Sequence, residues 1–477
     1  MKQFATITLG CKVNQYDGAA LGATLEQQGW RRHRRGQPDL VIVNTCCVTV
    51  AAMAKSRQAI RRCAHRWPAA HMLVVGCYSD YDPRRLRQVL DTEGVAPNRA
   101  PIAGHHDDLR VHLEQVMQRL DEPSAGQAEI PPRAVAAGTT TELPAVALKA
   151  RRLAALAARS AGTSRLEPLA RFPGHQRAFV KVQDGCDAFC TFCVVPYTRC
   201  VVRSRPTGQI LDECRRLVAY GHREIVLCGV FLGAFGRSTA IRRRWATGPA
   251  PLVELVRQVS RIPGLWRVRL SSLEPADVTD EFLDACRALP AFAPHLHLPL
   301  QSGSPSVLRR MNRGYTPEQF LQVARRARQA FDRPAISTDI IVGFPGESDE
   351  DFAQTLDLAR AAGFMKIHAF PFSPIPGAAA WNWRQQAAPP SQLHRRTRQL
   401  AELEQRLAAQ YRRQWVGGQL EGLVEKVDDR GVCRAVSDRY AELLFEAKDA
   451  TAGQVARMRV TGMQDGLLTG RFLGRVC

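Results

Sequence analysis

The sequence predicts an α/β protein with an amino-terminal open parallel α/β sheet domain, a central partial (β/α)6 barrel and a small carboxyl-terminal all-β barrel. Two stretches of the chain alternate short apolar runs with helical patterns, as parallel sheets require. The last part of the chain carries only short apolar runs separated by glycines, which is typical of a small β-barrel. The length of 477 residues fits about three domains at roughly 150 residues each.

The amino-terminal domain is expected to span residues 1–112. Its apolar runs have the length of strands, and the segments between them show helical patterns. The expected strands are 3–10, 39–46 and 71–78, and the expected helices are 15–28 and 50–66. Residues 113–171 are rich in Ala, Pro, Thr and Arg and are expected to form a linker with one short helix.

The central domain is expected to span residues 172–405, where the strand–helix alternation repeats six times. Six βα units in a row favour a parallel barrel, or most of one, over a second open sheet. The expected strands are 178–185, 224–230, 267–275, 295–301, 335–344 and 366–373. Residues 241–250 are expected to form a surface loop. A basic helix over 393–413 leads into residues 406–477, which are expected to form a barrel of the oligonucleotide-binding kind.

The charge of the chain indicates a polyanionic partner. Lys and Arg number 66 against 45 Asp and Glu, which gives a net charge of +21. Such an excess favours nucleic acid first and an acidic membrane surface second, and an Arg-rich composition without such a partner is the alternative.

The cysteine content suits a reducing compartment. The amino terminus lacks the pattern of an export signal, and no run of about 18 apolar residues predicts a membrane span. We therefore expect a cytoplasmic protein without membrane contact. There, the 14 cysteines favour metal or redox roles over structural disulfides.

Three of these cysteines, Cys186, Cys190 and Cys193, stand close together in the stretch DGCDAFCTFCVVPYTRC. Their spacing fits one face of a helix, where free Cys packs as a small apolar residue. The alternative is an iron–sulfur site, which the position favours because catalytic loops follow the strands of such barrels and Gly185 allows a tight turn. Three thiolates leave a [4Fe–4S] cluster one ligand short of four, and the open iron can bind substrate. Cys200 follows a Pro-Tyr turn and is set aside as a fourth ligand.

This stretch resembles the CxxxCxxC signature of the radical S-adenosylmethionine enzymes. The resemblance implies that the open iron binds S-adenosylmethionine, which one electron cleaves to methionine and a 5′-deoxyadenosyl radical. Gly343 and Pro345 in TDIIVGFPGE, and Gly229 and Gly233 in CGVFLGAFG, end strands and are expected to contact this cofactor. Polar residues that end other strands are expected at the barrel mouth or in hydrogen-bonded core positions: Glu274, His297, Gln301 and Ser302.

A second set of three cysteines, Cys11, Cys46 and Cys77, is spread along the amino-terminal domain. Each ends an expected strand, in TLGC, VNTC and VVGC, and the carboxyl ends of parallel strands share one edge of the sheet. We therefore expect a second three-thiolate cluster, with buried small residues or a disulfide pair as the alternatives. Cys46 is preferred to Cys47 because successive side chains of a strand point to opposite faces.

With both sets in view the chain resembles the methylthiotransferases along nearly its whole length. The motifs that carry the resemblance are LGCKVNQYD (9–17), NTCCVT (44–49), GCY (76–78), RLSSLEP (269–275), HLHLPLQSGS (295–304), RMNRGY (310–315), DIIVGFPGE (339–347) and FPFSPIPG (370–377). The tail resembles the RNA-binding TRAM module. The resemblance implies two [4Fe–4S] clusters and S-adenosylmethionine: the first cluster makes the radical, and the second carries the inserted sulfur.

The stretch GCKVNQY resembles the branch that modifies N6-threonylcarbamoyladenosine at position 37 of tRNA, next to the anticodon. The alternatives are the branches acting on N6-isopentenyladenosine in tRNA or on a ribosomal-protein aspartate. The implied partners are tRNA, an electron donor of the flavodoxin or ferredoxin type and a sulfur donor. Phe231 and Cys200 stand where the family more usually has Asn and Gly, and the linker over residues 113–171 is longer than expected. These departures remove no cluster ligand, but they affect how firmly the resemblance identifies the substrate.

Two other classes of protein compete with the enzyme. An RNA-binding protein with structural metal sites is disfavoured, because such sites are normally closed by four ligands. A redox carrier does not need a barrel of six βα units.

Overall fold

The computed structural model describes the chain except residues 106, 122–165, 167, 246, 247, 249 and 477. The short helix expected in the linker therefore lies outside the described residues. The chain divides into two compact units, and each is considered by itself. The first contains Met1–Leu169, Gly185–Asp187 and Val194–Val202, and the second contains the rest.

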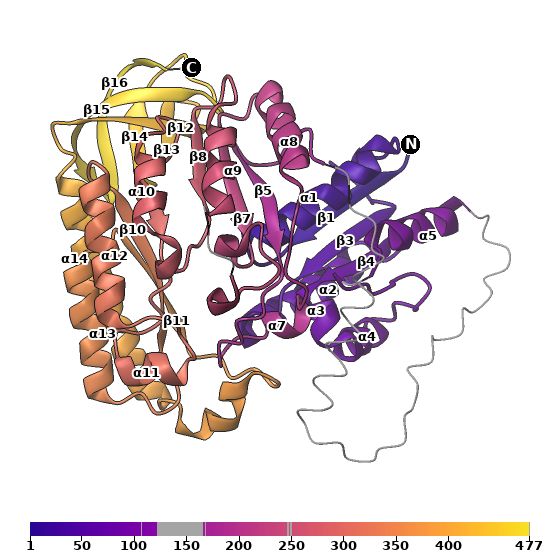
Figure 1. Ribbon diagram of the computed structural model, residues 1–477. Helices are drawn as coiled ribbons and strands as arrows, with labels where there is room; N and C mark the ends of the chain where they lie inside the picture. Colours follow the sequence, from indigo (N-terminus) through magenta and orange to yellow (C-terminus); the bar gives the residue numbers. More distant parts are fainter. Residues whose placement is uncertain (106, 122–165, 167, 246–247, 249, 477) are drawn as a thin grey trace. The chain divides into compact units, whose positions relative to one another are not determined.

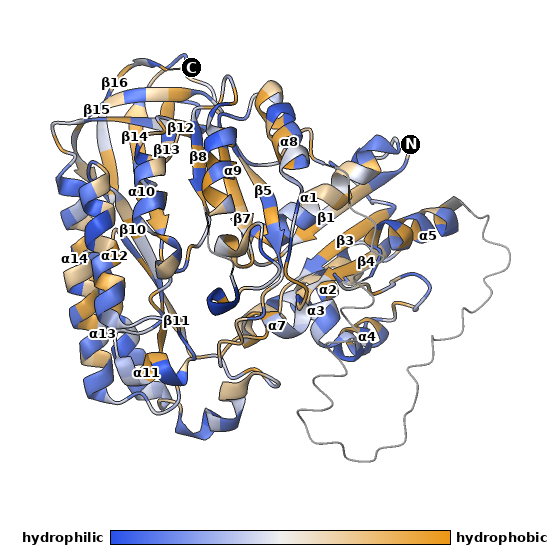
Figure 2. Cartoon of the chain, viewed as in Figure 1, coloured by the Kyte–Doolittle hydropathy of each residue, from blue (hydrophilic) through white to orange (hydrophobic). Residues whose placement is uncertain are grey.

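The first unit is built on a parallel sheet, as the sequence predicts. The strand order is β2-β1-β3-β4, with β1 at Gln3–Thr8, β2 at Arg31–Arg32, β3 at Leu40–Thr45 and β4 at His71–Gly76. The helices are α1 (Lys12–Gln27), α2 (Val50–Arg66), α3 (Cys77–Tyr81), α4 (Pro83–Thr92), α5 (Leu109–Asp121) and α7 (Val195–Thr198). Every residue of β3 is buried, and Figure 2 shows β3 and β4 as largely apolar. A sheet with such a centre fixes the positions of the loops that follow its strands.

The second unit begins with a six-stranded parallel α/β body, which confirms the predicted partial barrel. One sheet has the order β6-β5-β7-β8, and the other has the order β11-β10-β9. Backbone bridges Val268↔Phe292 and Ser272↔His297 join the edges of the two sheets. Helices cover the outside of this curved sheet (Figure 1). The strands are β5 (Arg177–Asp184), the short antiparallel β6 (Arg203–Ser204), β7 (Glu224–Gly229), β8 (Arg267–Leu270), β9 (His295–His297), β10 (Ala335–Val342) and β11 (Lys366–Pro371).

The helices of this body alternate with its strands. They are α8 (Thr207–Tyr220), α9 (Pro251–Ser260), α10 (Asp280–Arg287), α11 (Pro305–Arg310), α12 (Pro317–Ala330), α13 (Asp349–Ala362) and α14 (Pro390–Arg413), with 3-10 turns η1 (Leu232–Ala234), η2 (Arg242–Arg244), η3 (Pro275–Asp277) and η4 (Ala379–Gln386). The turn η2 lies within residues 241–250, which were expected to form a surface loop. Helices α5 and α14 run across the expected boundaries after residues 112 and 405, and those boundaries remain predictions. None of the described helices is both long and apolar enough to cross a membrane.

The carboxyl-terminal module is a closed five-stranded barrel, as predicted for a TRAM-like domain. Its order is β12-β13-β14-β16-β15, with β12 at Gln419–Val427, β13 at Val432–Ser437, β14 at Glu442–Glu446, β15 at Val455–Gln464 and β16 at Leu467–Arg475. Closure leaves no strand edge open for pairing with another chain. The turn between β13 and β14 leaves the barrel toward the α/β body.

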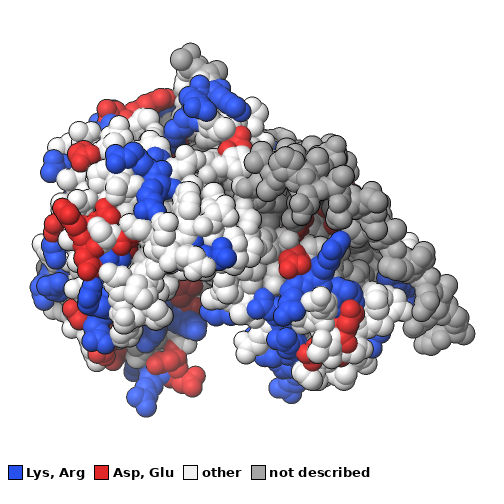
Figure 3. All heavy atoms as spheres, turned by 90° about the horizontal axis from the view of Figure 1, so that it is seen from below, with Lys and Arg blue, Asp and Glu red and all other residues white. Residues whose placement is uncertain are grey.

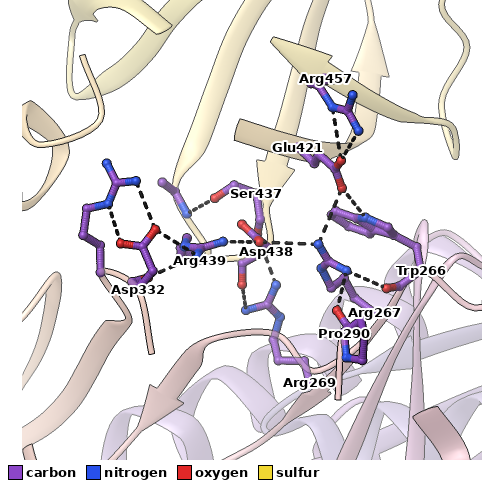
Figure 4. Close-up of polar contacts among 12 residues, drawn as sticks. Trp266, Arg267, Arg269, Pro290, Asp332, Glu421, Ser437, Asp438, Arg439 and Arg457 are labelled. Atoms are coloured by element: carbon purple, nitrogen blue, oxygen red, sulfur yellow. Dashed lines mark hydrogen bonds and ion pairs between the residues drawn. The ribbon is translucent and has the colours of Figure 1, made fainter. Parts of the chain in front are cut away.

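That turn is held by Arg269 of β8 (Figure 4). The Arg269 side chain is 2% exposed and donates from Nε to Glu224 Oε1 at 2.7 Å. It also donates to the carbonyl oxygens of Ser437 at 3.1 Å and Asp438 at 3.0 Å. The ring of Tyr440 lies 5.0 Å from the guanidinium carbon of Arg269. The turn thus supplies two carbonyl oxygens and an aromatic ring that stabilise the buried positive charge of Arg269.

We expect Arg269→Met to destabilise the second unit by about 3–5 kcal/mol, because it leaves the buried Glu224 carboxylate without its partner. Urea unfolding followed by hydrogen exchange in β12–β16 measures the loss. The control is Arg457→Met, which removes an ion pair to Glu421 whose arginine side chain is 49% exposed. That pair is worth about 1 kcal/mol or less. Equal losses in the two variants would contradict the role of Arg269.

Candidate functional site

The three spread cysteines follow adjacent strands of the first unit. Cys11 is the N-cap of α1, Cys46 follows β3 and Cys77 is the first residue of α3. The expected strands 3–10 and 71–78 were too long at their carboxyl ends: β1 ends at Thr8 and β4 ends at Gly76. The reason is that Gly10 and Gly76 take φ values of +98° and +102°, which end an extended chain.

The thiols of this set lie together. A Cβ atom on Gly10 would lie 2.8 Å from Cys46 Sγ, so the missing side chain leaves space that this sulfur occupies. Cys77 and Cys47 are hydrogen-bonded through their side chains. The buried Cys47, set aside from sequence, therefore belongs to the same thiol cluster. Alternation along β3 does not apply to it, since the strand has ended at Thr45.

Arg199 is the cation of this cluster, and the sequence analysis missed it. Its side chain is buried, and Nε lies 3.5 Å from Cys77 Sγ. Nη2 donates to Asp17 Oδ2 at 2.7 Å and to Asn14 Oδ1 at 2.9 Å, and it also contacts the His105 ring. No local pattern marks this residue, which is far along the chain from its partners.

These contacts set the ionisation of the thiols. The hydrogen bond from Cys47 and the positive charge of Arg199 lower the pKa of Cys77 to about 5, against the effect of burial. Burial raises the pKa of Cys46 to about 12. These contacts therefore favour the thiolate at Cys77 and the protonated thiol at Cys46, whose proton a bound metal ion would displace.

The backbone of Arg199 also contacts the other cysteine set. Its carbonyl oxygen accepts a hydrogen bond from the N–H of Cys186 at 3.0 Å. Gly185, with φ of +80°, precedes this contact, and a Cβ there would overlap the carbonyl of Val201. Arg199 thus contacts a cysteine of each set: Cys77 through its side chain and Cys186 through its main chain.

Cys190 and Cys193 lie in a loop of the second unit that the RMNRGY motif holds. The N–H of Cys193 donates to the carbonyl of Cys190 at 3.0 Å. Arg313 Nη1 donates to Cys190 Sγ at 3.2 Å and pairs with Glu274. Asn312 donates to the carbonyls of Ala188 and Phe189, at 3.2 and 3.1 Å. The motif therefore supplies the loop with both a cation beside a thiol and a fixed backbone.

Two family models match the chain. The model described as "Radical SAM superfamily" matches residues 180–359, and the one described as "Uncharacterized protein family UPF0004" matches residues 3–95. A threonylcarbamoyladenosine tRNA methylthiotransferase MtaB of Chlamydia pneumoniae is 33% identical over 89% of this chain and 87% of its own length. The chain belongs to the radical SAM methylthiotransferase family.

Relatives of two kinds match this chain over nearly its whole length. The enzyme named MtaB from Bacillus subtilis (strain 168) is 29% identical over 96% of this chain and 94% of its own length. A tRNA-2-methylthio-N(6)-dimethylallyladenosine synthase of Paracoccus denitrificans is 33% identical over 98% and 97%. Among solved structures, the radical S-adenosylmethionine methyltransferase TsrM of Kitasatospora setae covers 80% of this chain and 74% of its own, with 16% identity and a TM-score of 0.53, which is a likeness of fold.

Enzymes of the radical SAM methylthiotransferase family use S-adenosylmethionine and two [4Fe–4S] clusters, and this chain is such an enzyme. The residues present fit these groups. Thiolates are the usual ligands of iron–sulfur clusters, and both thiol sets lie beside a buried guanidinium that stabilises sulfur-centred negative charge. Because Gly10 has no side chain, the thiol of Cys46 can lie close to the backbone at Gly10.

Most residues expected to contact S-adenosylmethionine lie at or just after the ends of β7 and β10, and Glu274 follows β8. The structure gives several of them protein partners. A Cβ on Gly229 would lie 3.0 Å from the side chain of Gln183, and a Cβ on Gly233 would overlap Asp277. The N–H of Gly343, where φ is +74°, donates to Glu347 Oε2 at 2.7 Å. Pro345 is buried, and Glu274 pairs with Arg313. Their contact with the cofactor remains a prediction.

Proposed function

We propose that the protein adds a methylthio group to carbon 2 of N6-threonylcarbamoyladenosine at position 37 of tRNA. The observation that carries the proposal is the similarity, over at least 94% of this chain and of the relatives, to enzymes of that name from Bacillus subtilis and Thermotoga maritima. The amino-terminal stretch GCKVNQY supports the same branch. The N6-dimethylallyladenosine substrate is the second candidate, because relatives of that name reach 34% identity.

Six cysteines are the proposed cluster ligands. Cys186, Cys190 and Cys193 would hold the cluster that binds S-adenosylmethionine, and Cys11, Cys46 and Cys77 would hold the second one. When bound, these groups supply the radical that removes hydrogen from the adenine ring and the sulfur that replaces it. Gly229, Gly233, Glu274, Gly343 and Pro345 are the proposed surroundings of S-adenosylmethionine.

The chain's own groups have defined parts in this proposal. Arg313 holds positive charge against the Cys190 sulfur, and Asn312 fixes the backbone of the loop that carries Cys190. Arg199 stabilises the thiolate of Cys77.

The charge of the surface suits a tRNA substrate. Figure 3 shows Lys and Arg spread among Asp and Glu over the face in view rather than gathered in one patch. The overall excess of +21 attracts the RNA backbone. We further propose an electron donor of the flavodoxin or ferredoxin type, a separate sulfur donor, and a cytoplasmic location, where tRNA is modified.

Nucleoside analysis tests the substrate. In a strain lacking the gene, we expect the 2-methylthio form of N6-threonylcarbamoyladenosine to disappear and its unmethylthiolated precursor to accumulate, as measured by mass spectrometry of digested tRNA. Restoring the gene should restore the product, and restoring a Cys190→Ala copy should not. Loss of 2-methylthio-N6-isopentenyladenosine instead would assign the chain to the second branch.

A further inference from the structure

A group of metal-ligand residues lies on three adjacent strands, apart from the cysteines. His297 ends β9, Asp339 lies in β10, and His368 lies in β11. The strand register sets Ser337 of β10 opposite His297 and sets Asp339 opposite His368. One ligand atom from each of His297, Asp339 and His368 lies within 4.8 Å of the other two. Neighbouring parallel strands therefore bring two imidazoles and a carboxylate to one place.

The distances inside the group suit a shared cation. His297 Nε2 lies 3.2 Å from Asp339 Oδ2, about the separation of two neighbouring ligands that are each about 2.1 Å from one metal ion. The His297 and His368 rings have centroids 5.9 Å apart. His368 is exposed, so rotation of its side chain can bring a ring nitrogen closer to His297 and Asp339.

A second layer of hydrogen bonds orients His297. Its Nδ1 lies 3.0 Å from Ser337 Oγ, and the same hydroxyl lies 2.9 Å from His295 Nε2. The His295 ring in turn stacks on Tyr440, with centroids 4.8 Å apart. Metal-bound histidines are usually held in this way through the nitrogen that does not bind the metal. His297 therefore presents Nε2 in a fixed direction toward Asp339.

The exposure of the group fits a site open to solvent. The side chains of His297 and Asp339 are 16% and 27% exposed. Leu296 and Ile340, their neighbours in sequence, are 1% and 0% exposed and belong to the opposite face of the strands. A hydrogen-bonded pair of His297 and Asp339 alone would not require a second imidazole beside it.

We propose that His297, Asp339 and His368 bind one divalent transition-metal ion. Two imidazoles and one carboxylate are the ligand set that suits Mn²⁺, Fe²⁺ and Zn²⁺, and three protein ligands leave coordination positions open. With one carboxylate the bound site keeps a net charge of about +1. The open positions accept an oxygen ligand, such as a carboxylate or a hydroxyl group. The site shares no residue with either thiol set or with the glycines expected around S-adenosylmethionine.

Mn²⁺ titration of the anaerobically reconstituted holoenzyme tests the site. In their oxidised diamagnetic state the [4Fe–4S] clusters give no electron paramagnetic resonance signal, so the signal of free Mn²⁺ reports binding directly. After chelator treatment and desalting, we expect one Mn²⁺ per chain to be bound and Zn²⁺ to displace it. His368→Ala and Asp339→Asn should each weaken binding at least tenfold, and Ser337→Ala should weaken it about tenfold through the second layer.

Two measurements separate loss of the site from loss of the fold. The variants should keep the iron-to-protein ratio and the melting temperature of the parent, as expected for the exposed His368. His394→Ala, which removes another exposed histidine of the same unit, should bind Mn²⁺ like the parent. The proposal is overturned if the parent holoenzyme binds neither Mn²⁺ nor Zn²⁺ at this stoichiometry, or if His368→Ala and Asp339→Asn bind as the parent does.

Discussion

Cys190→Ala will abolish cleavage of S-adenosylmethionine, whereas Cys46→Ala will keep cleavage and lose methylthiolation. Cys190 belongs to the loop held by Arg313 and Asn312, so its loss removes one of the three proposed ligands of the cluster that binds the cofactor. Cys46 belongs to the other thiol set. Formation of 5′-deoxyadenosine, measured by chromatography, and methylthiolated tRNA, measured by mass spectrometry, separate the two effects.

Cys200→Ala and Cys47→Ala are the matched controls, since each lies next to one of the sets without being a proposed ligand. Cys200→Ala should cleave S-adenosylmethionine like the parent. Cys47→Ala should retain both clusters, although it loses the hydrogen bond to Cys77. If methylthiolation survives in Cys46→Ala but not in Cys47→Ala, the ligand is Cys47 and the proposed assignment is wrong.

The second large effect is expected from Arg199→Met. The substitution leaves Asp17 and the Cys77 thiolate without their buried cation, at a cost of about 3–5 kcal/mol in the stability of the first unit. Because the thiolate is no longer stabilised, reconstituted iron should fall from about eight to about four atoms per chain. Iron analysis and thermal unfolding of the purified variant measure the two losses.

Arg199→Lys distinguishes charge from geometry. Lysine keeps a positive charge but lacks the planar fork with which Arg199 contacts Asp17, Asn14 and Cys77 together, so we expect partial iron content. Arg203→Met, an exposed arginine in β6, is the control and should match the parent. Full iron content in Arg199→Met would show that the second thiol set binds its cluster without this cation.

Patterns along the chain predicted the architecture well, because alternation of apolar runs depends on local periodicity. The same patterns overextended some strands: 267–275 and 295–301 were expected where β8 ends at Leu270 and β9 ends at His297. Residues after His297 still bond to β10, through Leu298 and Gln301, but Gln301 takes a φ of +63° and the regular ladder stops. Apolar content alone does not report that change of backbone direction.

The cysteines could be grouped from sequence because one set stands close together along the chain and the other follows strands whose ends share an edge. The cations that lie beside these cysteines could not be identified from sequence. Arg199 reaches Cys77 across 122 residues and Arg313 reaches Cys190 across 123, and neither arginine stands out among the many in the chain. Cys47 was set aside by a rule for strands that does not hold where β3 has already ended. Contacts of this kind depend on tertiary packing rather than on local pattern.

The turn that joins β13 to β14 has a consequence for protein engineering. Tyr440 rests on His295 and on Arg269, so residues of the tail complete the interior of the preceding α/β body. A truncated chain ending before β12 would expose Glu224 and Arg269 to water and is a poor choice of minimal catalytic fragment. Chimeras that exchange tails between relatives should transfer these contact residues as a set, because the tail residue Tyr440 packs on His295 and Arg269 of the body.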